Sequence, residues 1–134
     1  MYAYIVFYRP AQWWGWLIAG YQLLRGIRYW QLTHCEVMTE QGLFAYRLDS
    51  VEHGTITADI PMPDKCVRIP LGCDRLTLFA RSRKFHRKFG DFTPLSVVNG
   101  NHCVKHTRYI LNMSAVSRLP GALAHELEGI YEIN

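Results

Sequence analysis

Residues 2–8 form an unbroken run of aromatic, β-branched and small apolar side chains near the start of the chain. Such residues are enriched in β-strands, and a short continuous apolar run is typical of a strand that is buried. Arg9 and Pro10 end the run, because proline has no N–H to donate to a strand ladder. The sequence therefore predicts a buried strand over residues 2–8.

The remaining segments predict a mixture of helices and further strands. Apolar residues recur at helical spacing over 12–28, 76–89 and 102–113. Strand-like runs lie at 29–39, 43–49, 54–60 and 66–70, and the tail from Ser114 is expected to pack as a short helix or strand. With 134 residues and 49% hydrophobic content, the chain suits one α+β domain over residues 1–134, in which an antiparallel sheet packs against helices.

Residues 40–42 supply turn chemistry between two of the expected strands, which predicts a β-hairpin. If Gln41 and Gly42 form a two-residue turn, positions whose numbers add to 83 face each other. His34 would then lie opposite Asp49 on the same face of the hairpin. Tyr46, Arg47 and Ser50 are the alternatives if the register differs.

The chain has a formal net charge of +4, and the excess of basic residues lies mainly in residues 81–88. The candidate basic binding patch comprises Arg81, Arg83, Lys84, Arg87 and Lys88. A basic cluster can bind nucleic acid, anionic lipid or an acidic cell-wall polymer, and it can equally be a solvated helix face. Nucleic acid is not the partner that we expect here.

The cysteines are Cys35, Cys66, Cys73 and Cys103, and no pair has the spacing of a zinc motif. The N-terminus lacks the features of a secretory signal, so we expect synthesis in the cytoplasm and free thiols there. The most apolar stretch, residues 13–24, is shorter than the roughly 20 residues that a spanning helix needs. Trp13, Trp14 and Trp16 are candidates for peripheral membrane contact, although a buried or half-buried helix explains them too.

Cys103 is the candidate nucleophile, because it follows the turn-forming residues 99–101 and starts a predicted helix. Helix N-termini favour a thiolate over a thiol, which lowers the thiol pKa and increases reactivity. A buried cysteine that packs as a small hydrophobe is the competing interpretation. His34 on a strand is the candidate general base, with Asp49 as the carboxylate that would hold its imidazole.

Two histidines flank the candidate nucleophile. His102 could steady an oxyanion, and His106, one helical turn after Cys103, could line the cleft. Phosphate-binding loops, HExxH, GxSxG and dinucleotide fingerprints are absent from the sequence. No metal site and no cofactor is expected.

The order of these segments resembles the circularly permuted NlpC-like branch of the papain-like cysteine hydrolases, which includes relatives of lecithin:retinol acyltransferase. The resemblance rests on YIVFYRP, a Trp/Leu-rich helix, LTHCEVM, FAYRLDS, GTITADI and HCVKHTRYIL. It implies that His34 is the base, Cys103 the nucleophile and Asp49 the acidic third member. Cys35 and Glu36 replace a usual small apolar pair, His102 stands where relatives often have Asn, and Asp49 replaces Glu.

The resemblance implies a papain-like fold and hydrolysis or acyl transfer through a thioester, without metal or cofactor. The leading hypothesis is a peptidase or amidase acting on a peptide, such as a cell-wall peptide. The second is a non-catalytic virion or tail protein of a phage, with partners in the particle. The first two hypotheses are compatible if the particle carries the chain as an enzyme. The third is a lipid acyltransferase or lipase at a membrane surface.

Overall fold

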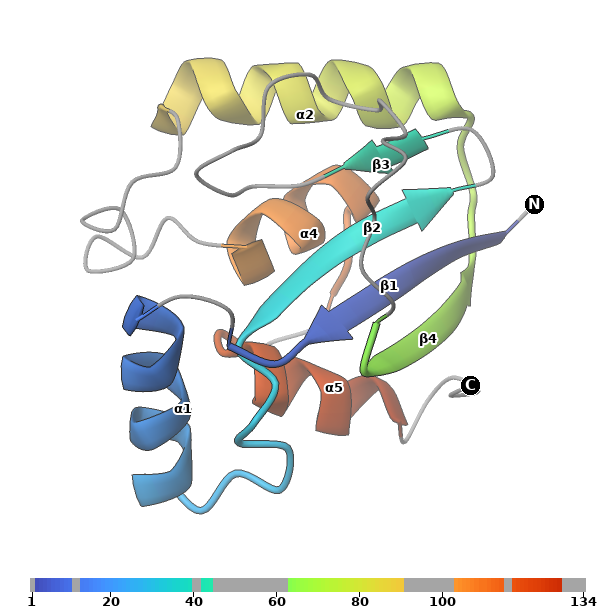
Figure 1. The fold of residues 1–134 in the computed structure, drawn as a ribbon. Coiled ribbons are helices and arrows are strands. Elements are labelled where there is room, and N and C mark those ends of the chain that lie inside the picture. The colour runs from blue at the N-terminus through green and yellow to red at the C-terminus, as the bar shows by residue number, and fades with distance from the viewer. Residues whose placement is uncertain are drawn as a thin grey trace.

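The computed structural model describes residues 2–10, 13–39, 42–44, 63–90, 103–114 and 117–128. In these segments the chain forms a four-stranded antiparallel sheet and four helices, which confirms the predicted α+β class (Figure 1). The strands are β1 (Tyr2–Tyr8), β2 (His34–Thr39), β3 (Gly42–Phe44) and β4 (Lys65–Pro70). The helices are α1 (Trp13–Leu24), α2 (Arg75–Phe89), α4 (Cys103–Leu111) and α5 (Pro120–Glu128).

Strand β1 is an inner strand of the sheet, whose order is β3-β2-β1-β4. It pairs antiparallel with β2 on one side and with β4 on the other, so that Phe7 lies opposite both Cys35 and Lys65. Ala3, Ile5 and Phe7 are fully buried. The prediction of a buried N-terminal strand is therefore confirmed.

The β2–β3 hairpin forms as predicted, but its register is different. Thr39 pairs with Gly42, and Val37 pairs with Phe44, so facing positions add to 81 rather than 83. The predicted register, in which facing positions add to 83, is therefore wrong, because Gly42 already belongs to the ladder instead of to the turn. Asp49 itself, and the strand expected over 54–60, lie outside the described residues.

Strand β2 begins at His34, five residues later than the sequence predicts. The preceding segment turns instead of extending, and the buried side chain of Gln22 on α1 holds it in place. The Nε2 group of Gln22 donates to the backbone carbonyls of Trp30 and Leu32, each at 2.9 Å. A side chain from α1 thus competes with strand pairing and sets the residue at which β2 starts.

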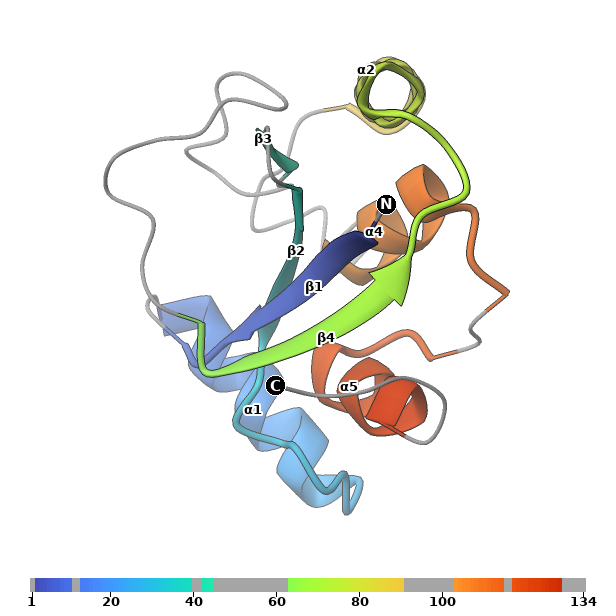
Figure 2. The same ribbon diagram turned by 90° about the vertical axis from the view of Figure 1, so that its right-hand side faces the viewer.

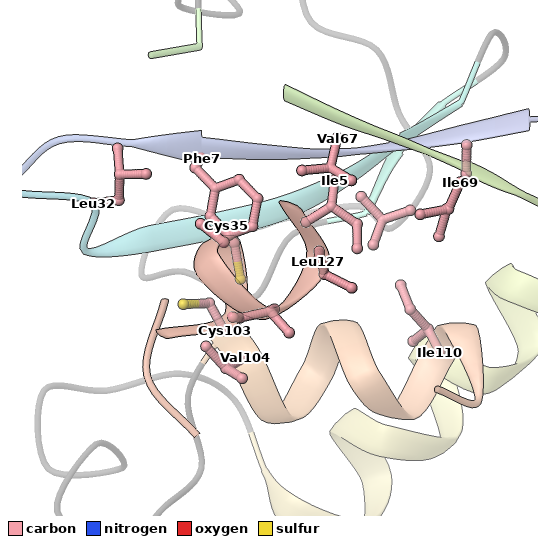
Figure 3. Packing of buried hydrophobic residues seen from close by; sticks show 14 of the residues in the cluster. Ile5, Phe7, Leu32, Cys35, Val67, Ile69, Cys103, Val104, Ile110 and Leu127 are labelled. Atoms are coloured by element: carbon pink, nitrogen blue, oxygen red, sulfur yellow. The ribbon is translucent and has the colours of Figure 1, made fainter. Parts of the chain in front are cut away.

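Helices α4 and α5 lie on one face of the sheet, and α2 packs against α4 (Figure 2). The hydrophobic core lies between the sheet and these helices (Figure 3). Its largest fully buried apolar side chains are Ile5, Phe7, Leu78, Ile110, Leu123 and Leu127. Burying apolar area of this kind is the main favourable contribution to folding, and here it fixes α4 against β2.

Candidate active site

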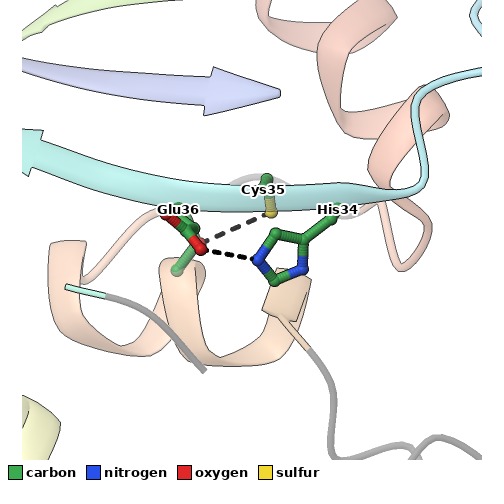
Figure 4. Close-up of polar contacts among 4 residues, drawn as sticks. His34, Cys35 and Glu36 are labelled. Carbon is green, nitrogen blue, oxygen red and sulfur yellow. Dashed lines mark hydrogen bonds and ion pairs between the residues drawn. The ribbon is translucent and has the colours of Figure 1, made fainter. Parts of the chain in front are cut away.

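His34 is the first residue of β2, and its imidazole is held by a carboxylate from the same strand. The Nε2 atom of His34 lies 2.8 Å from Oε1 of Glu36 (Figure 4). Residues two apart in a strand project from the same face, which is why the two side chains meet. Glu36 is buried and His34 is about a quarter exposed, with 26% of its side chain accessible.

Cys103 is the first residue of α4 and is buried, with 5% of its surface exposed. Its thiol contacts the imidazole of His34, to which it is hydrogen-bonded. The N-terminus of a helix carries partial positive charge and N–H groups without partners inside the helix, both of which stabilise a thiolate. The structure therefore brings together the two residues that the sequence analysis singled out.

Opposing effects act on the pKa of His34. Burial lowers it, while the charge and hydrogen bond of Cys103, followed by the hydrogen bond and charge of Glu36, raise it. The favourable contacts outweigh burial and raise the pKa of His34 from 6.5 to about 10. The imidazole is thus held in its protonated form at neutral pH, between a sulfur and a carboxylate.

Glu36 and Cys103 both interact with the imidazole of His34. Nε2 of His34 lies 2.8 Å from Oε1 of Glu36, and the thiol of Cys103 interacts with the same imidazole. A base oriented by a carboxylate and paired with a thiol is the arrangement that nucleophilic catalysis by cysteine requires. These three residues come from only two elements, β2 and α4.

Cys35 is a second thiol next to Cys103. Its Sγ lies 3.5 Å from Oγ1 of Thr107, which is one turn after Cys103 on α4. Burial raises the pKa of the Cys35 thiol well above its usual range, and the hydrogen bond with Cys103 adds to this. Cys35 is therefore held as a neutral thiol beside the candidate nucleophile.

His106 lies in the interface between α4 and α2, where its side chain is buried. Its Nε2 is 2.9 Å from Oγ of Ser82, and its ring contacts Phe85 at 5.1 Å between centroids. His106 therefore packs between the two helices. The prediction that it lines the cleft beside Cys103 is wrong, because its ring points toward α2. His102 lies outside the described residues.

The basic stretch of α2 divides into one anchored residue and four exposed ones. The guanidinium of Arg81 donates to the carbonyl of Ile110 at 2.9 Å and so ties α2 to the end of α4. The exposed residues are Arg83, Lys84, Arg87 and Lys88. These four side chains are exposed to solvent, whereas Arg81 makes a structural contact between two helices.

Helix α1 carries large apolar side chains on its exposed surface. Trp13, Trp16 and Leu17 are each more than 60% exposed, and Leu24 is 88% exposed. Trp14 is half-buried, and the fully covered positions are the small or polar Gly15, Ala19 and Gln22. None of the helices in the described segments has the length and apolar character needed to cross a bilayer.

The described residues contain no group of three or more His, Cys, Asp or Glu side chains placed to hold a metal ion. Comparison with protein-family models, with curated proteins and with solved structures finds no match for this chain. The chemistry of the site therefore has to be argued from its own residues.

Glu36 is the site residue that the sequence analysis did not identify. It stands two positions after His34, and this spacing alone places both on one face of a strand. The sequence does hold a signal for Glu36, since it is a charged residue inside the otherwise apolar run Cys-Glu-Val-Met. A carboxylate buried in such a strand needs a hydrogen-bonding or charged partner. The partner of His34 lies along its own strand, and not across the hairpin as the sequence suggested.

Proposed function

We propose that the chain is a cysteine-dependent hydrolase in which Cys103 is the nucleophile, His34 the general base and acid, and Glu36 the residue that orients His34. The observation that carries this proposal is that one imidazole interacts with both a carboxylate and a thiol: Nε2 of His34 lies 2.8 Å from Oε1 of Glu36, and Cys103 is hydrogen-bonded to the same ring. Glu36 takes the role expected of Asp49, because it makes the hydrogen bond that Asp49 was expected to make.

The reaction follows from this arrangement. The Cys103 thiolate attacks a carbonyl carbon, and the N–H groups at the start of α4 face the developing oxyanion. The His34 imidazolium then gives its proton to the leaving amine or alcohol, which leaves a thioester on Cys103. Water attacks the thioester while His34 takes up a proton, and release of the acid restores Cys103.

The substrate class is proposed from the resemblance to the NlpC-like hydrolases, many of which cleave amide bonds in peptides. A peptide of the bacterial cell wall is the leading candidate. The exposed cations of α2, at Arg83, Lys84, Arg87 and Lys88, favour an acidic polymer of this kind.

The first experiment measures whether Cys103 is an activated nucleophile. Protein is treated with limiting iodoacetamide at pH 7, and the labelled peptides are quantified by mass spectrometry. We expect Cys103 to react faster than Cys66, whose pKa is raised by burial. Changing His34→Ala should remove this advantage, because the imidazolium that stabilises the thiolate is gone.

The second experiment measures hydrolysis. Purified cell-wall peptides and a chromogenic ester are incubated with the wild type and with Cys103→Ala, and the products are identified by mass spectrometry. Turnover that Cys103→Ala abolishes is the expected result. A protein whose biological effect survives Cys103→Ala would instead act without catalysis, as a virion or tail component on the same fold would.

A second candidate function is favoured by the exposed surface of α1. This helix contains no acidic residue, and the exposed Arg25 and Arg28 follow its C-terminal end. Exposed tryptophans beside basic residues are typical of helices that lie in the interface of an anionic membrane. The same Cys103 site could then act on a lipid ester, as a lipase or acyltransferase does.

Flotation with vesicles separates this candidate from the first. We expect the protein to float with phosphatidylglycerol vesicles, and the double change Trp13→Ser and Trp16→Ser to reduce the bound fraction. Tyr2→Ser is the matched control, because Tyr2 is also half exposed but lies on β1. Equal binding by all three proteins, or by none of them, would remove the membrane candidate.

A further inference from the structure

Two buried thiols face each other between β2 and the first turn of α4. The side chains of Cys35 and Cys103 lie close to one another in the core (Figure 3), and a hydrogen bond joins them. Cys35 comes from the strand that carries His34, and Cys103 comes from the helix packed against that strand. Neither thiol is part of a disulfide, and the same holds for Cys66 and Cys73.

The contacts of Cys35 locate it over the start of α4. Its Sγ is 3.5 Å from Oγ1 of Thr107, and residues 103 and 107 are neighbours on one face of the helix. A hydrogen bond also joins Cys35 directly to Cys103. Cys35 is therefore placed to reach the sulfur of Cys103.

The two remaining cysteines lie elsewhere. Cys66 pairs with Val6 in the sheet, whereas Cys35 pairs with Phe7, so their side chains project from opposite faces. Cys73 precedes α2, where its Sγ is 3.8 Å from the guanidinium of Arg81. Neither is a partner for Cys103 in this arrangement.

We propose that Cys35 and Cys103 form a reversible disulfide when hydrogen peroxide oxidises Cys103, and that this bond protects the nucleophile while switching the enzyme off. The inference rests on the proposed function, since it takes Cys103 to be the reactive thiol. It goes beyond that function, because it assigns a role to Cys35, which takes no part in hydrolysis.

The chemistry proceeds in two balanced steps. The Cys103 thiolate attacks one oxygen of hydrogen peroxide, the O–O bond breaks, and Cys103 becomes a sulfenic acid while hydroxide leaves and is protonated to water. The Cys35 thiol then attacks the Cys103 sulfur, the S–O bond breaks, and the proton of Cys35 leaves with the hydroxyl group as water. One peroxide is reduced to two waters and two thiols are oxidised to one disulfide.

The order of events follows from the environments of the two sulfurs. Peroxide reacts with thiolates, and Cys35 is kept as a thiol by burial and by the hydrogen bond that it donates to Cys103. Oxidation therefore begins at Cys103, which faces the His34 imidazolium. Without a neighbouring thiol, a sulfenic acid is oxidised further to a sulfinic acid, which ordinary reductants do not reverse.

The test maps the oxidised thiols directly. Reduced protein is exposed to hydrogen peroxide, the remaining thiols are alkylated, and the tryptic peptides are analysed with and without dithiothreitol. We expect peptide 29–47 to be linked to peptide 89–105, with an intact mass lower by two hydrogens. Dithiothreitol should release both peptides and restore labelling of Cys103 by iodoacetamide.

Variants separate the role of Cys35 from general oxidation. In Cys35→Ser, and in Cys35→Ala as a second variant, we expect peroxide to leave Cys103 as a sulfinic acid that dithiothreitol does not rescue. Cys66→Ser is the matched control and should form the link as the wild type does. A link between other cysteines, or wild-type Cys103 that stays reduced or passes directly to sulfinic acid, would overturn the inference.

The outcomes for the two proposals can be told apart. If Cys103 labels rapidly and hydrolyses substrate but forms no link with Cys35, the redox inference fails and the proposed function stands. If the link forms but Cys103→Ala does not alter any hydrolysis, the proposed function fails and the disulfide stands.

Discussion

At the scale of single residues, the decisive contact is the one between Glu36 and His34. A carboxylate that is almost fully buried needs hydrogen bonds or a positive charge nearby, since moving it out of water is costly. His34 supplies both, at 2.8 Å, and Cys103 adds a second reason for the imidazole to stay protonated. Glu36 is therefore explained by its role at the imidazole rather than by packing.

We expect Glu36→Gln to lower hydrolysis by roughly 10²-fold, within the range that a positioned general base contributes. The amide keeps the shape of the side chain but removes the negative charge that helps raise the pKa of His34. Steady-state kinetics against pH would measure the effect. Glu128→Gln is a matched control, because Glu128 lies on α5 and its carboxylate accepts a hydrogen bond from Tyr29. Equal losses in both variants would contradict the role given to Glu36.

The stability of the protein should depend on the protonation of His34. Its pKa is 6.5 without the fold and about 10 within it, so folding favours the protonated form. This contribution is fully present below pH 6.5 and is lost as the pH rises through about 10. We expect the free energy of unfolding, measured with urea, to fall across this window in the wild type and to fall less in His34→Gln.

At the scale of elements, α2 shows how local sequence sets the end of a helix. Asp74 is the N-cap, and its Oδ1 accepts hydrogen bonds from the backbone N and from Oγ1 of Thr77, at 2.9 and 2.7 Å. At the other end, Gly90 takes a φ of 81°, which is a conformation that favours glycine. Both signals are local, so the predicted span of this helix agrees with the structure to within one residue.

We expect Asp74→Ala to destabilise the protein and Asp74→Asn to be close to neutral, because asparagine caps helices as well as aspartate does. The hydrogen bonds from Thr77 hold the pKa of Asp74 below 3.8. The ionised carboxylate therefore stabilises the folded protein above that pH, and this stabilisation is lost as the pH falls and the carboxylate is protonated. Thermal melts at pH 7 and pH 3 would test this. A deficit in Asp74→Ala that is larger at pH 3 than at pH 7 would contradict it.

At the scale of the whole molecule, Gln22 connects segments that lie far apart in the chain. Its Nε2 donates to the carbonyls of Trp30 and Leu32, and its Oε1 accepts from the N–H of Gly121 on α5, at 2.8 Å. A side chain at Gly121 would place its Cβ only 2.3 Å from the carbonyl oxygen of Tyr29. This junction fixes the segment that leads directly into His34.

We expect Gln22→Leu to lower the free energy of unfolding by about 2–5 kcal/mol, because it leaves several buried backbone groups without partners. Labelling of Cys103 by iodoacetamide should also slow, since the entry to β2 positions His34. Urea unfolding and labelling rates would measure both effects. Gln31→Leu is the control, because Gln31 is exposed, and an equal loss there would contradict the role of Gln22.

The sequence by itself determined the elements and the two residues of the site that carry strong local signals. Residues 2–8 specify a buried strand through their composition, and the turn-forming residue types before Cys103 predict a helix that starts near that residue. His34 was identified as the base because it stands within a strand-like run, and the order of the segments pointed to a pairing with Cys103. The predictions of the strand and of the helix are confirmed, because each depends on neighbours along the chain. The catalytic roles of His34 and Cys103 stay predictions.

Only the tertiary structure decided the hairpin register, the partner of His34 and the contact between Cys35 and Cys103. A shift of two positions keeps every side chain on its own face, so the alternation of residues cannot distinguish the register with Asp49 from the one that forms. The start of β2 depends on Gln22, which acts across the fold rather than along the strand. Contacts between distant segments depend on how helices and sheet pack, and this information is not contained in the pattern of any one segment.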